Sequence, residues 1–374
     1  MHDVIIVGGG PIGSIVGSLI ARNGFKVLII EKQAHPRWKP CGEGISIGGI
    51  QLFKQFDLYK PVQNILWEIT GVSINIIHEN VAIQRYDKPV AYTLNRENFD
   101  HALFKYAQEV GAETHETEKV IDLAILNGSK ISVKTTQKEY RSQILVGADG
   151  IYSLVGRKLF RTWEKDEVVP CQVARYRIPN KHHVFHPATM EYYFVKGGYG
   201  WVFPRVENER LILNIGMGKI GETKSSLNSL FNNFIDSIEN EKKVKLKGKE
   251  IDGKIWRHLA PTQGPSRGTY SDRCLLVGDA GGFVNPLTGG GLRYGALSAI
   301  YAAETIIKFL NNEIESLELY EDKWQRNISP VFDKSLEVRE KLYFMSPLQL
   351  LKKIQKHPEL TEQLFQSFIG RGNK

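Results

Sequence analysis

The chain has 374 residues, of which 42% are hydrophobic and 24% are charged. This composition is typical of a globular protein with a large core and excludes a disordered or coiled-coil chain, and the length predicts two domains or one large domain with insertions. Lysine and arginine total 49 against 41 acidic residues, which gives a formal net charge of +8. That balance favours an anionic partner: a nucleotide cofactor, a phospholipid surface or a nucleic acid.

The three cysteines, Cys41, Cys171 and Cys274, are far apart in the sequence and form no CxxC or His-Cys cluster. The pattern predicts neither a disulfide framework nor a bound metal, and it favours a reducing, cytoplasmic compartment. The uncharged stretch 4–21 contains several glycines and a proline, and it follows an aspartate rather than a basic segment. We therefore expect neither a signal peptide nor a transmembrane helix there.

The first elements in chain order form one βαβ unit. Residues 3–7 and 26–30 are β-branched runs expected to be buried strands, and residues 11–23 between them have the apolar spacing of a helix that ends at Gly24. A loop rich in glycine and proline is expected over 35–49.

The remaining elements alternate between strands and helices. Strands are expected within 70–94, at 119–124, 130–135, 143–147 and 273–277, and within 168–218 at 172–178, 190–195, 200–203 and 211–217; helices are expected at 96–110, at 223–239 and from Gly289 almost to the end.

These elements predict an α/β (α+β) fold. A discontinuous, Rossmann-type three-layer domain is expected to comprise 1–68 with 96–165 and 265–330. A mainly antiparallel β-sheet substrate domain, 69–95 with 166–264, is inserted into it, and 331–374 form a helical C-terminal region.

A GxGxxG motif of Gly8, Gly10 and Gly13 lies between the first strand and the first helix. The first glycine permits a tight turn, the second lets the backbone approach a pyrophosphate, and the third lets helix and strand pack closely. The helix begins at Pro11 and Ile12, and the free N–H groups that follow the proline, together with the positive end of the helix dipole, are offered to that anion. We expect dinucleotide binding; the alternative is a glycine-rich turn without a ligand.

Glu31, followed by Lys32, ends the second strand, where a carboxylate accepts hydrogen bonds from ribose hydroxyls. Two later segments indicate which dinucleotide is bound. One is Gly147-Ala148-Asp149-Gly150; the other runs from Leu275 to Ala280 and is followed by Pro286 and Gly289-Gly290-Gly291. In this order the three motifs resemble those of the FAD-dependent aromatic hydroxylases, and the resemblance implies that the cofactor is FAD.

Asp279 leaves a strand beside a glycine, a geometry that places a carboxylate against the ribityl hydroxyls, although a turn or N-cap aspartate is the alternative. Gly289 to Gly291 precede the helix that begins at Leu292, whose N-terminus would stabilise negative charge on a reduced flavin. The resemblance implies three further cofactor contacts, at Arg96, Val120 and Asp149. The alternatives are a solvated arginine, core packing and a local turn, respectively.

Two segments look like the geranylgeranyl reductase family, in particular the archaeal digeranylgeranylglycerophospholipid reductases. One is Lys39 to Ser46, which contains a PCGEG loop with Cys41, Gly42 and Gly44; the other is the YGWVFP segment that begins at Tyr199. The resemblance implies that hydride from reduced FAD saturates C=C bonds of isoprenoid chains, with the loop near the flavin.

Tyr199, Trp201 and Phe203 alternate along a strand, so they share one face, which suits a long apolar chain; the alternative is ordinary core packing. Cys41 either contacts the flavin, gates it or fills space. We take Cys41, Tyr199 and Trp201 as candidate catalytic residues, and the aromatic residues with Pro286 as candidate substrate contacts.

The flavin needs an electron donor, and we expect it to be reduced by transiently bound NAD(P)H or by another donor such as ferredoxin. The lysine-rich region from Lys334 predicts either peripheral contact with an anionic membrane or a helix packed on its own protein. No nucleic-acid module is recognised. Alternative functions are a flavin-dependent aromatic monooxygenase or halogenase-like enzyme, and a non-enzymatic prenyl-binding escort protein.

Overall fold

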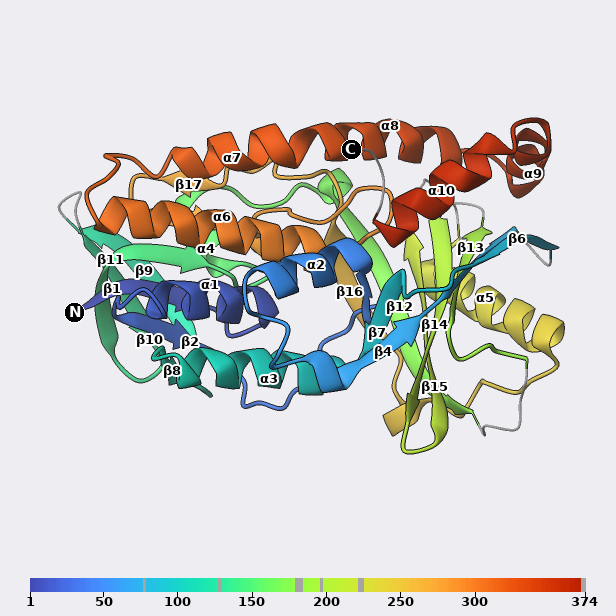
Figure 1. Cartoon of the computed structure of the whole chain (residues 1–374), viewed down its shortest axis with the longest axis horizontal. Helices are drawn as coiled ribbons and strands as arrows, with labels where there is room; N and C mark the ends of the chain where they lie inside the picture. Colours follow the sequence, from blue (N-terminus) through green and yellow to red (C-terminus); the bar gives the residue numbers. More distant parts are fainter. Residues whose placement is uncertain (77–78, 127–129, 179–183, 196–197, 221–224, 371–374) are drawn as a thin grey trace.

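Two large sheets lie one after the other along the long axis of the molecule, with helices above and in front of them (Figure 1). The computed structural model describes residues 1–76, 79–126, 130–178, 184–195, 198–220 and 225–370. The N-terminus lies at the outer end of the first sheet, and the last two helices lie over the second sheet.

The first sheet has eight strands within the described residues, and its central strands are parallel, in the order β18, β11, β1, β2, β8. The hairpin β9–β10 pairs with β11, and the short β17 pairs with β18 at the edge. The strands are β1 (His2–Val7), β2 (Val27–Ile30), β8 (Glu113–His115), β9 (Val120–Leu126), β10 (Lys130–Thr135), β11 (Glu139–Gly147), β17 (Tyr270–Ser271) and β18 (Cys274–Leu276).

Helix α1 (Pro11–Ala21) packs against both α3 (Arg96–Glu109) and α6 (Leu292–Leu310) beside this sheet. The buried β-branched residues of β1 and β2 fit a parallel strand covered by helices. Gly17 of α1 allows a close approach, because a Cβ there would lie 2.5 Å from Cδ1 of Ile29. The predicted βαβ unit is therefore confirmed.

The second sheet is antiparallel except where β13 and β5 run parallel, and its order is β16, β12, β15, β14, β13, β5, β6. Helix α5 (Leu227–Lys242) covers one face, where Phe234 leaves no room for a side chain at Gly200: a Cβ there would lie 2.4 Å from Cζ of the ring. The strands are β5 (Gly71–Ile76), β6 (Glu79–Arg85), β12 (Val168–Ile178), β13 (Thr189–Val195), β14 (Gly198–Glu207), β15 (Arg210–Lys219) and β16 (Trp256–Pro261). The helix expected at 223–239 begins at Leu227; residues 223–224 lie outside the described residues.

A small third sheet corrects the expectation of a loop over 35–49. Strand β3 (Gly44–Ser46) pairs with β7 (Ala91–Leu94), which also pairs with β4 (Leu66–Ile69), and helix α2 (Ile47–Gln55) follows β3 directly. The glycine-rich sequence gives no strand signal, because β3 forms only through its long-range partner β7.

Beyond α6 the chain is helical, as expected, but in four further pieces: α7 (Leu319–Asn327), α8 (Ser329–Tyr343), α9 (Pro347–Lys356) and α10 (Glu359–Ile369). Leu350 and Ile354 of α9 and Phe365 and Phe368 of α10 are buried in the core that covers the second sheet. The apolar faces of these helices are thus packed on the protein itself. Across the described residues, no helix is long and apolar enough to cross a membrane.

Candidate active site

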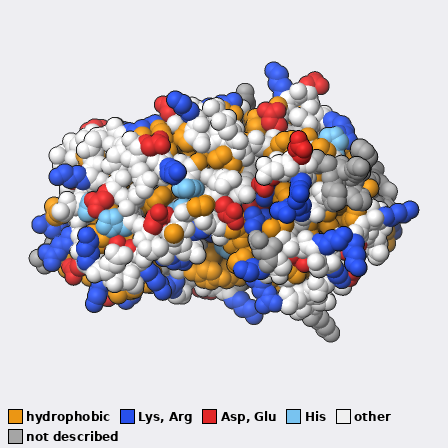
Figure 2. Space-filling model, turned by 90° about the horizontal axis from the view of Figure 1, so that it is seen from below, with side chains coloured by type: hydrophobic (Ala, Val, Ile, Leu, Met, Phe, Trp, Pro, Cys, Tyr) orange, Lys and Arg blue, Asp and Glu red, His pale blue; other side chains and the backbone are white. Residues whose placement is uncertain are grey.

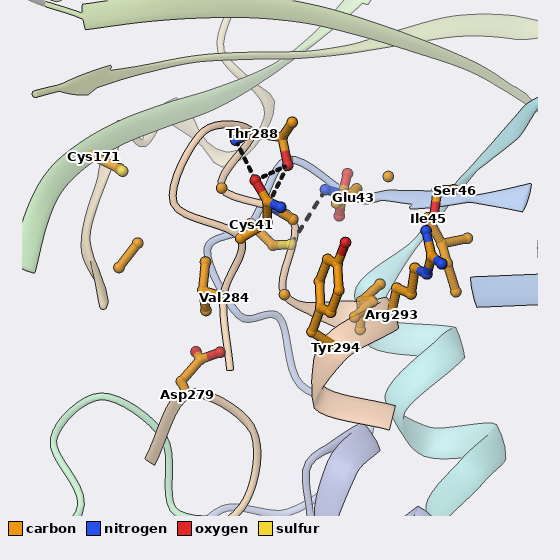
Figure 3. A pocket seen from close by; sticks show the side chains of 18 of the residues that line it. Cys41, Glu43, Ile45, Ser46, Cys171, Asp279, Val284, Thr288, Arg293 and Tyr294 are labelled. Carbon is orange, nitrogen blue, oxygen red and sulfur yellow. Dashed lines mark hydrogen bonds between the residues drawn. The ribbon is translucent and has the colours of Figure 1, made fainter. Parts of the chain in front are cut away.

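A cavity is lined by segments that follow strands of the first sheet and by strands of the second sheet, and Figure 3 shows the side chains of part of this lining. One part of its lining is backbone-rich and the other is aromatic. The backbone-rich part includes Gly10, Pro11, Ile12, Ala148, Gly150, Asp279, Gly289, Gly290, Gly291 and Leu292; the aromatic part includes Met190, Tyr192, Tyr199, Trp201, Phe203 and Phe368; the loop 39–46 borders both.

The three motif glycines have different roles. A Cβ on Gly8 would lie 2.5 Å from the Ala148 carbonyl oxygen, and a Cβ on Gly13 would lie 2.0 Å from that of Gly8, so both glycines are needed for the turn itself. A Cβ on Gly10 would meet only Arg37, at 3.6 Å. Gly10 lines the cavity whereas Gly8 and Gly13 do not, so Gly10 is the glycine whose backbone is open to a ligand.

The buried Glu31 organises this turn from behind. Its carboxylate accepts hydrogen bonds from the backbone N–H of Gly9 (2.9 Å) and of Gln33 (3.0 Å), and Arg37 lies 3.4 Å away. Glu31 and the exposed Lys32 are not among the cavity-lining residues, so their predicted cofactor contacts stay predictions.

Arg96 is buried, lines the cavity and forms a bidentate ion pair with Asp100, with N–O distances of 2.7 and 2.8 Å. Burial is the largest single influence and raises the pKa of the Asp100 carboxyl, but the charge and hydrogen bond of Arg96, with the charges of Arg37 and Lys39, together outweigh it and the pKa is lowered. Both groups therefore stay charged, and Arg96 is held in place at the cavity wall.

Asp279 lies in the single 3-10 turn Gly278–Ala280 that follows β18, and its carboxylate is 3.4 Å from the ammonium group of Lys39. Burial is the largest single influence and raises the pKa of Asp279, yet Lys39, His258 and Arg96 together outweigh it and the pKa is below its usual value. An ionised carboxylate thus faces the cavity as a hydrogen-bond acceptor.

These features fit FAD. The N-termini of α1, at Gly10, and α6, at Gly291, lack a side-chain cap, and both border the cavity, so their first N–H groups are available to a ligand. Asp279 completes the set with an acceptor for hydroxyl groups. An extended molecule with a pyrophosphate, a polyol chain and a ring that carries negative charge when reduced has a matching partner for each of these parts.

Three further predicted contacts lie outside the cavity lining. Asp149 caps helix α4 (Leu154–Leu159), accepting hydrogen bonds from the backbone N–H of Leu154 (2.7 Å) and of Val155 (3.3 Å). Val120 is buried in the core next to β1 and β2, and Pro286 is buried beside the cavity-lining Asn285.

The aromatic residues of β14 share one face, as predicted, and Tyr199, Trp201 and Phe203 all line the cavity. The ring centroids of Tyr199 and Trp201 are 5.8 Å apart, and Phe203 is 5.1 Å from Tyr192 of β13. The Tyr199 hydroxyl donates a hydrogen bond to the Thr288 carbonyl (2.5 Å), and burial raises its pKa. These neighbouring rings form an aromatic wall of the cavity.

Cys41 lies between Asp279 and Glu43 in the close view (Figure 3). Its sulfur accepts a hydrogen bond from the Glu43 backbone N–H at 3.4 Å. Cys171 of β12 lines another part of the same cavity, where burial raises its thiol pKa to about 12.

Sequence reasoning missed several residues. Glu43 is fully buried and pairs with Arg205 of β14, while His258 of β16 and Phe368 of α10 line the cavity. Phe368 stacks on Tyr192 with ring centroids 3.9 Å apart. Arg293, two residues after Gly291, donates a hydrogen bond to the Gly370 carbonyl and so fastens the end of α10. Only Glu43 had a local signal, its place in the PCGEG loop; the others depend on long-range packing.

Comparison with known proteins agrees with this site. The model of the FAD binding domain family matches residues 1–335. A digeranylgeranylglycerophospholipid reductase 1 from Methanopyrus kandleri is 29% identical, covering 98% of this chain and 97% of the relative. One from Methanococcoides burtonii is 30% identical, over 91% of this chain and 84% of the relative.

A solved structure from Thermoplasma acidophilum, described as geranylgeranyl bacteriochlorophyll reductase-like, superposes with a TM-score of 0.81 at 25% identity, covering 94% of this chain and 90% of the other. Halogenase PltM, solved with FAD, has a TM-score of 0.72 at 19% identity, over 89% of this chain and 75% of the other, which shows a shared fold.

The fold, the cavity and these relatives together define an FAD-dependent oxidoreductase. More narrowly, the chain belongs to the geranylgeranyl reductase family of FAD-binding proteins, alongside the archaeal digeranylgeranylglycerophospholipid reductases.

Proposed function

We propose that the protein saturates C=C bonds of geranylgeranyl or other isoprenoid chains, in prenyl lipids such as digeranylgeranylglycerophospholipid. The observation that carries the proposal is the continuity of the cavity: one space joins the uncapped N-termini of α1 and α6 to a wall of aromatic side chains. A long apolar chain fits such a wall, and the relatives' names support this substrate class.

When bound and reduced, FAD would supply a hydride to one carbon of the double bond, and the other carbon would take a proton, so that each bond gains two hydrogen atoms. The chain's own residues bind the substrate, orient it and exclude water from the cavity. An isolated alkene is a poor hydride acceptor, so positioning and exclusion of water carry much of the catalysis. Tyr199, Trp201 and Phe203 form the aromatic wall, and the ring of Phe368 from α10 packs beside it. Cys41 borders both parts of the cavity and is the candidate to contact the reacting centre.

An anaerobic assay tests the proposal. Dithionite-reduced protein is incubated with several prenyl lipids, and products are identified by mass. A gain of two hydrogen atoms per double bond is expected. No gain with any prenyl substrate contradicts the proposal, and NADPH-dependent oxygen consumption stimulated by a phenol would instead indicate an aromatic monooxygenase. Repeating the assay with NAD(P)H or ferredoxin in place of dithionite identifies the donor, for which we propose one of these two.

We further propose peripheral contact with anionic membranes around the turn between α8 and α9. Phe344 and Leu348 are 65% and 61% exposed there, and Lys352 and Lys353 follow on α9. On the face seen in Figure 2, lysines and arginines are mixed with acidic side chains rather than gathered in one stripe. Liposome flotation should weaken in a Phe344→Ser/Leu348→Ser variant but not in Ile125→Ser, a control on β9; equal flotation of all three proteins contradicts this contact.

A further inference from the structure

Asn214 lies on β15 with none of its surface exposed. Its side-chain oxygen accepts a hydrogen bond from the indole Nε1 of Trp201 at 2.8 Å. Its side-chain nitrogen donates to the backbone carbonyl of Cys41 at 2.8 Å and to the Glu43 carboxylate at 3.1 Å. One amide thus connects the aromatic wall of the cavity to the loop that borders the cofactor part.

The chemistry of the three partners leaves little choice of residue. The indole N–H only donates, and the Cys41 carbonyl and the Glu43 carboxylate accept. The three partners therefore require one acceptor and two donors on a short side chain, which is what the asparagine amide offers. An aspartate would satisfy Trp201 but face the carboxylate of Glu43, and a leucine of similar size would satisfy none of the three.

The neighbouring residues make the connection rigid. The Glu43 carboxylate forms an ion pair with Arg205 and accepts a hydrogen bond from Nε1 of Trp38 at 3.2 Å. Gly42 packs against the aromatic wall, because a Cβ there would lie 3.4 Å from Nε1 of Trp201 and 3.4 Å from Phe203. From outside the loop, Asn214 thus holds it through two hydrogen bonds, alongside the ion pair of Arg205 with Glu43.

We propose that Asn214 is a positioning residue that holds Trp201 and the Cys41 loop in one geometry, so that an apolar chain on the aromatic wall meets the cofactor at a fixed place. Its kinetic consequence rests on the proposed prenyl reduction, whereas its effect on the loop does not. The two are therefore measured separately.

Hydrogen exchange followed by mass spectrometry tests the loop in the purified holoprotein. In Asn214→Leu we expect the peptide covering 38–46 to exchange at least tenfold faster than in wild type, with α1 unchanged. Asn75→Leu, which removes another buried asparagine from the same sheet, is the control and should leave 38–46 unaffected. Equal protection of 38–46 in Asn214→Leu and wild type overturns the proposal. If Asn214→Leu does not fold, Asn214→Ser is measured by the same criteria.

Kinetics of the reduced enzyme test the consequence for catalysis. We expect kcat of Asn214→Leu to fall by about 100-fold, with KM changed only a few-fold, because misplacement by about 1 Å costs that much. Trp201→Phe removes only the indole donor from this contact, so its effect and that of Asn214→Leu should combine to less than their product. Fully multiplicative effects, or an unchanged kcat, overturn the positioning role. If wild type reduces no prenyl lipid, the proposed function fails, and the exchange experiment still decides whether Asn214 holds the loop.

Discussion

The indole of Trp201 lies over Gly216, its partner across the β14–β15 pair. A Cβ at residue 216 would come within 2.0 Å of indole Cζ2 and 2.4 Å of Cε2. The ring therefore occupies the place of a side chain on the neighbouring strand. Glycine is required there for space, and the orientation of one cavity wall depends on it.

Replacing Gly216 by alanine should displace Trp201. We expect a loss of about 1–3 kcal/mol of unfolding free energy, as for other overpacked sites, together with reduced prenyl reduction. The control is Gly218→Ala on the same strand, where the nearest atom to a Cβ, Sγ of Cys171, is at an ordinary 3.4 Å. Chemical denaturation and single-turnover rates compare the two variants; equal effects would contradict the specific role of the Trp201–Gly216 contact.

The glycine motif separates folding from cofactor binding. Gly10→Ala should fold like wild type, because the new methyl group meets only the end of Arg37, but it should lose most of the stabilisation that added FAD gives. That stabilisation is about 2.7 kcal/mol at 100 times the dissociation constant. Gly13→Ala should be destabilised even without FAD, since its Cβ would lie 2.0 Å from the Gly8 carbonyl oxygen. Thermal unfolding with and without FAD measures both effects, and full FAD stabilisation of Gly10→Ala would contradict the assignment of the open glycine.

Acid should destabilise the protein partly through His258. Burial, followed by the charge of Lys39, lowers the pKa of this imidazole to about 4, although Asp279 opposes the shift and Arg96 adds to it. An unfolded histidine has a pKa of about 6.5, so between these values the unfolded chain binds more protons. Stability is therefore expected to be lost as the pH falls from 6.5 towards 4, by at most roughly 3 kcal/mol.

His258→Gln should flatten this part of the pH profile of the unfolding free energy. The control is His357→Gln, at the exposed residue that ends α9, and its pH profile should be that of wild type. A His258→Gln profile that keeps the full slope between pH 6.5 and 4 would show that other groups cause the acid sensitivity.

Phe368 should influence which chains the cavity accepts. Its ring stacks on Tyr192 and lines the cavity, whereas Phe365, three residues earlier on α10, is also buried but is not part of the lining. Both Phe368→Ala and Phe365→Ala should lower the free energy of unfolding by about 3–5 kcal/mol. Only Phe368→Ala should change the ratio of kcat/KM between long and short prenyl substrates, by about tenfold. An unchanged ratio would place the substrate away from α10.

Local patterns in the sequence were sufficient for the nucleotide-binding part of the fold. The GxGxxG turn, the β-branched strands around it and the helix beginning at Leu292 each depend on neighbours close in the chain, because a glycine turn and a helix N-terminus are built from consecutive residues. The alternation of Tyr199, Trp201 and Phe203 likewise predicted a shared face, since side chains in a strand alternate with a period of two residues.

Which residues reach the Cys41 loop and complete the cavity lining was decided by the tertiary structure alone. Asn214, Arg205 and His258 carry no local motif, and they reach the Cys41 loop or the cavity only because the second sheet packs against it. Phe368 completes the lining from the last helix of the chain for the same reason. Pairing of buried polar groups and stacking of rings depend on distances between segments far apart in sequence, and the packing of the fold sets those distances.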